Sequence, residues 1–124
     1  MKDFFISRIH SFGHAFSGMA YVLKTQKNAY IHTFATVIVV LVALWLQISN
    51  IQFAILILTI GTVWTAEFIN TSLEAVVDLA SPEKHPLAKV GKDVGAAAVL
   101  IAAMSSVIIG ILILGPALLT KLGF

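Results

Sequence analysis

The chain has 124 residues, of which 59% are hydrophobic and only 11% are charged, with a formal net charge of +2 and a mean hydropathy of +0.97. A water-soluble domain carries about 25% charged residues, so this composition excludes an ordinary soluble domain and indicates an all-α integral membrane protein of one domain, residues 1–124. The absence of cysteine excludes disulfides and thiol chemistry, and basic residues that flank apolar runs are expected to orient membrane helices and not to bind nucleic acid.

The N-terminal segment, about residues 3–24, is expected to form an amphipathic helix. Apolar residues recur there at alternating spacings of four and three, which places them on one helical face. They are Phe5, Ile9, Phe12, Phe16, Met19 and Leu23. Such a helix either lies in the bilayer surface or packs on the bundle, and the sequence favours neither. Charged and histidine residues interrupt any signal peptide here, so we expect residue 1 to begin the working protein.

Two long uncharged runs predict three membrane-spanning helices. Residues 28–66 contain no Asp, Glu, Lys or Arg, and about 39 residues suffice for two crossings of about 20 residues each. Ser49-Asn50 is the natural turn between these two crossings. A further run of about 27 uncharged residues predicts a third span, with Pro116 near its end. The expected spans are 30–48, 51–70 and 94–119.

Basic residues predict how the helices are oriented. Lys and Arg gather before the first span and between the second and third, whereas the Ser49-Asn50 turn has none and the C-terminus has only Lys121. By the positive-inside rule, the N-terminus and the 78–93 loop face the cytoplasm and the C-terminus lies outside. Within this loop we expect Ser81 to cap a helix that starts at Pro82, with His85-Pro86 as a break or a restart before the third span.

The stretch AEFINTSLEAVVD, residues 66–78, places polar side chains at the end of the second span. On a continuous helix they share an arc of roughly 80°. They are Glu67, Asn70, Glu74 and Asp78. An ionisable group at membrane depth is costly, so Glu67 is expected to serve a function, and a desolvated carboxylate suits a general base. Glu74 lies two turns further out, where a divalent cation can bind with water and phosphate oxygens. The alternative is a structural ion-pair network with the lysines of the next segment.

That next segment is LAKVGKDVGAAAV, residues 87–99. Lys89, Lys92 and Asp93 share one helical face, which offers cations for phosphates and a carboxylate to orient a lysine or a metal. The lysines are alternatively simple anchors at the membrane edge. A second face carries the small residues Gly91, Gly95 and Ala98, a pattern that lets helices approach closely. No Walker A loop, glycine-rich dinucleotide loop or protein-kinase motif occurs in the chain.

The two stretches AEFINTSLEAVVD and HPLAKVGKDVGAAAV, in this order, resemble the prokaryotic diacylglycerol kinase family of small three-span lipid kinases. The pattern Glu-x-x-Asn-[ST]-x-x-Glu-x-x-x-Asp, then a His, then Ala-Lys-x-x-Lys-Asp and Ala-Ala-Val, is present in full. The likeness extends to the N-terminal helix with Gly18 and the segment NAYIH, and so covers nearly the whole chain. It implies a homotrimer in the bacterial plasma membrane, with a surface helix and three spans per subunit and active sites between subunits at the cytoplasmic face.

The resemblance also implies roles for particular residues in the transfer of the γ-phosphoryl group of ATP, with Mg²⁺, to a lipid hydroxyl. Glu67 corresponds to the catalytic base, and Glu74 to a metal ligand. Asn70 and Asp78 correspond to positioning residues. Contacts with ATP are implied for Glu83, His85, Lys92, Asp93 and, on the N-terminal helix, His14. Family members commonly carry a Glu as a second metal ligand where Gln26 stands here, and an amide oxygen can still ligate Mg²⁺ without charge.

His10 and His14 lie one helical turn apart, a spacing that also suits a metal pair. No acidic third ligand is close to them in the sequence, so we expect both to lie on the polar face of the N-terminal helix.

The sequence leaves alternatives open for the lipid acceptor and for the class of protein. NAYIH and SPEKHPLAK resemble the undecaprenol kinase branch more than the diacylglycerol kinase branch, so undecaprenol is the expected acceptor and diacylglycerol the alternative. A small proton-coupled multidrug transporter has a similar length and one intramembrane Glu, but it needs a fourth span and an acid usually in the first. The first span here has no acid. A pore-forming or structural protein would leave both acid–base segments without a purpose.

Overall fold

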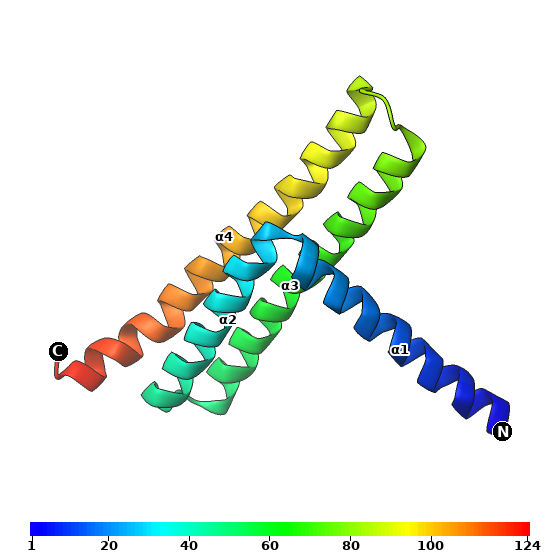
Figure 1. Ribbon diagram of the computed structural model, residues 1–124. Coiled ribbons are helices and arrows are strands. Elements are labelled where there is room, and N and C mark those ends of the chain that lie inside the picture. The colour runs from blue at the N-terminus through cyan, green and yellow to red at the C-terminus, as the bar shows by residue number, and fades with distance from the viewer.

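The computed structural model describes the backbone of residues 1–124 and every side chain except those of Lys2 and Asp3. Its helices are α1 (Lys2–Thr25), α2 (Lys27–Leu46), α3 (Asn50–Ala80) and α4 (Pro86–Leu122). Helices α2, α3 and α4 run side by side, each antiparallel to the next along the chain, while α1 extends away from them at a steep angle (Figure 1). These three neighbours are long and apolar enough to cross a membrane. The all-helical fold expected from the sequence is confirmed.

The turn between α2 and α3 is defined by backbone chemistry at both ends. Gln47 has a left-handed backbone (φ 54°, ψ 44°), which ends α2. Ser49 then caps α3, because its hydroxyl accepts a hydrogen bond from the Gln52 backbone N–H at 3.3 Å. The Gln52 side-chain oxygen accepts one from the Ser49 backbone N–H at 3.0 Å, which completes a capping box. The turn therefore lies where the sequence predicts it, with Asn50 as the first residue of α3.

The loop between α3 and α4 corrects one prediction. Ser81 does not cap a new helix, because its backbone N–H still bonds the carbonyl of Val77 at 2.9 Å and so belongs to the end of α3. Helix α4 starts instead at Pro86, where His85 Nδ1 accepts a hydrogen bond from a backbone N–H two residues on, at 3.2 Å. The helix expected from Pro82 does not form. The loop has two Xaa-Pro pairs, Ser81-Pro82 and His85-Pro86. Only the second starts a helix, because Ser81 still belongs to the end of α3 whereas His85 lies beyond it.

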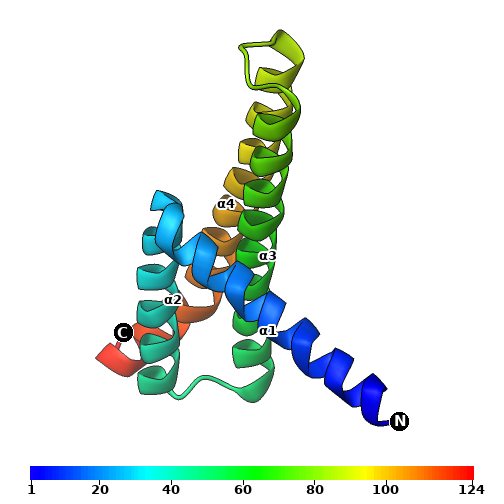
Figure 2. The same ribbon diagram turned by 45° about the vertical axis from the view of Figure 1, so that its right-hand side comes forward.

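Helices α3 and α4 pack closely and form a long hairpin that extends beyond α2 (Figure 2). Gly95 on α4 permits this approach, since a Cβ at this position would collide with the side-chain oxygen of Asn70 and crowd Leu73, both on α3. At the other end of the bundle, α2, α3 and α4 meet in a small buried core. Its buried members are Ala43, Leu56 and Ile113. Of the small residues predicted to form one face of α4, Gly95 is therefore the one at which α3 approaches closely.

Most large apolar side chains point away from the bundle, as expected for helices that face lipid. The predicted stripe on α1 is among them, from Phe5 at 63% exposed to Leu23 at 40%. Of the side chains described on α1, only Val22 is buried. Within one chain, the stripe is thus not packed on the bundle, which was one of the two arrangements considered from the sequence.

Gly95→Ala is expected to destabilise the protein by about 1–3 kcal/mol, because the added methyl group forces the Asn70 side chain and α3 away from α4. Thermal or denaturant unfolding of the purified protein in detergent measures this change. Gly110→Ala on the same helix is the matched control, since no atom lies within 4 Å of a Cβ built there. Equal melting temperatures for Gly95→Ala and the parent chain would contradict the close approach.

Candidate active site

The predicted polar stripe on α3 runs from the interior of the bundle to its surface. Glu67 is 1% exposed and Asn70 is 8% exposed, whereas Glu74 is half-buried and Asp78 is exposed. Because α3 continues without a break to Ala80, all four side chains extend from one rigid element, and Glu67 and Asp78 are about 16 Å apart along its axis. The stripe therefore connects a carboxylate shielded from solvent with one that solvent reaches.

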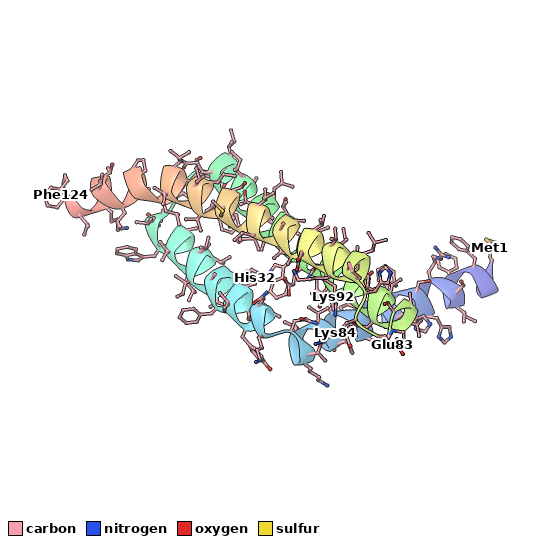
Figure 3. All side chains as sticks on the ribbon, turned by 90° about the horizontal axis from the view of Figure 1, so that it is seen from above. Met1, His32, Glu83, Lys84, Lys92 and Phe124 are labelled. Atoms are coloured by element: carbon pink, nitrogen blue, oxygen red, sulfur yellow. The ribbon has the colours of Figure 1, made fainter. Side chains whose placement is uncertain are left out.

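The carboxylate of Glu67 lies between α2 and α3, opposite His32. Its Oε2 is 3.7 Å from Nε2 of His32, and neither atom has a hydrogen-bond partner among the described residues. The His32 ring packs edge-on against Trp64, with 6.0 Å between ring centres. Trp64 Nε1 donates a hydrogen bond to the hydroxyl of Thr36 at 3.1 Å. His32 thus points from α2 toward the α3–α4 pair (Figure 3).

His32 is a site residue that our reading of the sequence did not identify. Helices α2 and α3 are antiparallel and joined by a short turn, so residues at equal distances from that turn face each other. Counted from Ser49-Asn50, His32 lies 17 residues before the turn and Glu67 lies 17 residues after it, and Thr36 and Trp64 lie 13 and 14 residues from it. The sequence distance of each residue from the turn could therefore have predicted that His32 faces Glu67, once the position of the turn is known.

Asn70 connects Glu74 with α4. Its Nδ2 donates a hydrogen bond to Oε1 of Glu74 at 3.1 Å. Its Oδ1 is buried against Gly95 and has no partner among the described residues. The described residues hold no group of three or more His, Cys, Asp or Glu side chains placed to bind a metal. A Mg²⁺ ion here fits only as it commonly binds in phosphoryl-transfer sites, on one or two protein oxygens with phosphate and water as its other ligands.

A cavity of about 640 Å³ opens where α3, the loop and α4 meet. It brings together five residues that the sequence assigned to the site: Asp78, Glu83, His85, Lys92 and Asp93. Lys92 Nζ bonds Oδ1 of Asp78 at 2.6 Å, and Lys89 forms an ion pair with Asp93. The hydrogen bond from Lys92 to Asp78 raises the pKa of this lysine above its ordinary value. Figure 3 shows Glu83 and Lys84 gathered at this end of the hairpin.

The ion pairs also test the alternative that the acids of the α3 stripe form a structural network with the lysines of α4. One lysine of the α4 segment does pair with an acid of the stripe, Asp78. Glu67, however, lies within ion-pair distance of His32 and of no lysine or arginine whose side chain is described. A lysine network therefore accounts for the exposed end of the stripe and leaves its buried end without an explanation.

Gln26 and His14 lie apart from this cavity. Gln26 separates α1 from α2, is half-buried, and bonds the Val22 carbonyl through its backbone N–H at 2.9 Å. His14 is exposed on α1. Neither residue lines the cavity between α3, the loop and α4. Of the seven residues expected to bind ATP or the metal, four therefore line this cavity, namely Glu83, His85, Lys92 and Asp93. Glu74 lies on the α3 stripe, and Gln26 and His14 lie apart in the single chain.

Comparison with known proteins shows which family and which curated proteins the chain resembles. Residues 13–114 match the family described as prokaryotic diacylglycerol kinase. The chain is 45% identical over 111 residues to a diacylglycerol kinase of Synechocystis sp., a match that covers 89% of this chain and 63% of that protein. It is 39% identical over 108 residues to an undecaprenol kinase of Bacillus subtilis, covering 87% and 88% respectively. It is 40% identical over 74 residues to a diacylglycerol kinase of Escherichia coli K12, covering 60% and 61%.

Proposed function

Because the chain belongs to the prokaryotic diacylglycerol kinase family, we propose that it is an ATP-dependent kinase that phosphorylates the hydroxyl group of a membrane lipid. The observation that carries this proposal is the continuity of α3, which joins the buried carboxylate of Glu67 to a charged, solvent-accessible cavity. A lipid hydroxyl can approach the first, and a nucleotide from water can enter the second. The multidrug transporter alternative needs four spans, whereas the described residues form three helices of spanning length and composition.

At the lipid end, Glu67 acts as the general base. The lipid hydroxyl oxygen attacks the γ-phosphorus of ATP, the bond from that phosphorus to the ADP oxygen breaks, and Glu67 takes the hydroxyl proton. The positioning role falls to Asn70, one turn along α3, whose side chain is held between Glu74 and Gly95. Little covalent work is required of the protein in such a transfer, so the placement of these groups supplies most of the catalysis.

At the nucleotide end, Lys92 supplies positive charge for the phosphates, oriented by its hydrogen bond to Asp78. Asp93, Glu83 and His85 line the same cavity and are assigned to contacts with ATP. Two turns separate Glu74 from Glu67, about 10 Å along the axis of α3. The phosphates therefore extend from the cavity along α3 toward the buried carboxylate. We also assign His14 to this end through the resemblance, without a contact in the single chain.

Glu74 and Asn70 are the residues that would hold Mg²⁺. Through the resemblance we assign Gln26 as a further, neutral oxygen ligand, without a contact to them in the single chain. The buried and unpartnered oxygen of Asn70 fits this role. A Mg²⁺ ion held by these residues would supply positive charge that offsets the negative charge of the phosphates.

We assign undecaprenol as the lipid acceptor, ahead of diacylglycerol. Support comes from the segments NAYIH and SPEKHPLAK and from the match to the undecaprenol kinase of B. subtilis, which covers 88% of that protein. Diacylglycerol is the second candidate because the Synechocystis diacylglycerol kinase has the higher identity, 45% against 39%. Both lipids present a hydroxyl group at the membrane interface, so the core site serves either.

We further propose a homotrimer in the bacterial plasma membrane, with the N-terminus and the 78–93 loop in the cytoplasm and the C-terminus outside. The distribution of Lys and Arg supports this orientation, since it places the charged cavity in the compartment that contains ATP. The exposed apolar stripe of α1 supports a position in the bilayer surface.

Purified protein offered labelled ATP together with undecaprenol and diacylglycerol in equal amounts is expected to label undecaprenol preferentially. The label is followed by separating the two lipid phosphates. Preferential labelling of diacylglycerol would replace undecaprenol as the acceptor, and label in neither lipid would overturn the lipid kinase proposal.

Glu67→Gln is expected to lower the rate of lipid phosphorylation by a factor on the order of 10²–10⁴, because the amide cannot accept the hydroxyl proton. The variant keeps the shape of the side chain, so helical content and assembly in detergent should be unchanged. Lys121→Gln removes a charge at the opposite end of the bundle and serves as the active control. Substantial residual kinase activity in Glu67→Gln would show that another group is the base.

Gln26→Glu is expected to retain activity and to lower the Mg²⁺ concentration needed for half-maximal rate, because a carboxylate binds Mg²⁺ more strongly than an amide oxygen. A Mg²⁺ titration of the rate at saturating ATP measures this shift. Gln47→Glu, in the turn at the far end of the bundle, adds the same charge away from the site and should not change the Mg²⁺ requirement. Loss of activity in Gln26→Glu would show that the amide has another role.

A further inference from the structure

We propose that His32 is a positioning residue for phosphoryl transfer, whose ring N–H holds one oxygen of the Glu67 carboxylate and so directs the other toward the lipid hydroxyl. This inference rests on the proposed role of Glu67 as the base. It adds a residue from α2 to a site otherwise built from α3, the loop and α4.

The burial of Glu67 creates the need for such a partner. A carboxylate that is 1% exposed has lost its water, and its Oε2 has no hydrogen-bond partner among the described residues. Nε2 of His32 is equally buried and equally without a partner, 3.7 Å away. Two complementary polar atoms that face each other in a dry site lower their shared desolvation cost by forming one hydrogen bond.

The other polar side chains near Glu67 are already occupied. The hydroxyl of Thr71 bonds the backbone carbonyl of Glu67 at 2.9 Å and is not directed at the carboxylate. The side-chain amide of Asn70 donates its hydrogen bond to Glu74. His32 is therefore the side chain that remains for the buried acid among those the structure describes.

The ring of His32 is braced where it stands. Its edge packs on Trp64, and Trp64 is itself tied back to α2 by the 3.1 Å hydrogen bond to Thr36. The ring therefore has little freedom to turn away from Glu67. The present 3.7 Å separation exceeds a hydrogen bond of about 2.7–3.2 Å, and a small closure when lipid binds would complete it, as catalytic hydrogen bonds commonly tighten in the substrate complex.

A hydrogen bond from His32 would fix the direction in which the Glu67 carboxylate points. A carboxylate with one oxygen held fast presents its second oxygen along a defined line, and a displacement of about 1 Å at a reacting group can cost about 10²-fold in rate. The contribution of His32 should consequently appear in kcat and not in the binding of ATP, whose cavity lies at the other end of the stripe.

Steady-state kinetics of two His32 variants test this. His32→Leu is expected to lower kcat for lipid phosphorylation by about 10–100-fold with the KM for ATP within about twofold of the parent. His32→Gln restores an N–H donor at nearly the same place and is expected to recover most of the lost rate. Thr33→Val is the matched control, because that neighbouring hydroxyl bonds only the Ala29 carbonyl of its own helix. Unchanged kcat in His32→Leu, or no recovery in His32→Gln, would overturn the positioning role.

A spectroscopic test does not require activity. The chain has four histidines, so ¹⁵N-histidine labelling yields four pairs of ring nitrogen signals, one pair for each residue. Glu67→Gln is expected to shift the ring nitrogen signals of His32 and to leave those of His10, His14 and His85 in place. Unmoved His32 signals would show that the two side chains do not interact.

The two tests separate failure of this inference from failure of the proposed function. An active parent enzyme with a fully active His32→Leu variant would refute the role of His32 and leave the kinase proposal standing. A parent chain that labels no lipid would refute the kinase proposal, and the positioning role with it, even where the NMR signals show that His32 and Glu67 touch. If His32→Leu does not fold, the His32→Gln kinetics and the Glu67→Gln spectrum decide the question.

Discussion

The burial of one carboxylate is the constraint on which the rest of this structure depends. Glu67 is shielded from solvent at a depth where an unpaired charge is expensive, so the surrounding helices must supply both a dry pocket and a polar partner. Helix α2 supplies His32, and the Trp64–Thr36 hydrogen bond holds α2 against α3 one turn deeper in the bundle. The register of the α2–α3 pair thus decides which side chain faces the buried carboxylate.

A second consequence follows from the unbroken length of α3. A helix that stopped at the membrane edge would leave Glu74 and Asp78 on a flexible loop, whereas α3 carries them outward in line with Glu67. Helix α4 can follow it closely because Gly95 has no side chain to separate the two. The ion pair between Lys92 and Asp78 then joins the two helices beside the cavity assigned to the nucleotide. The two ends that we assign to the lipid and to the nucleotide are therefore held at a fixed separation by one rigid hairpin.

Much of this arrangement follows from local patterns in the sequence. The uncharged runs, the capping signal at Ser49 and the arc of acids after the second span each depend on residues that are near neighbours along the chain. The prediction that failed, a helix start at Ser81, also depended on a local signal. It failed because α3 continues far enough to use the backbone N–H of Ser81. Which of the two successive Xaa-Pro pairs starts the next helix therefore depends on where α3 ends. The surface position of α1, the role of Gln26 and the trimer stay predictions.

The sequence by itself determined the membrane class, the number of long apolar helices and the polar stripe on α3, because helical periodicity and hydrophobic length are properties of contiguous residues. Only the tertiary structure decided which partner faces the buried acid. Lys89 and Lys92 carry the opposite charge and are closer to Glu67 in the sequence than His32 is. Lys89, however, pairs with Asp93 on its own helix, and the packing of α4 on α3 brings Lys92 to Asp78. His32 precedes Glu67 by 35 residues in the sequence. It reaches Glu67 because the turn between α2 and α3 makes the two helices antiparallel neighbours. Partners of this kind are set by the register between helices, and that register depends on the turn and the packing together.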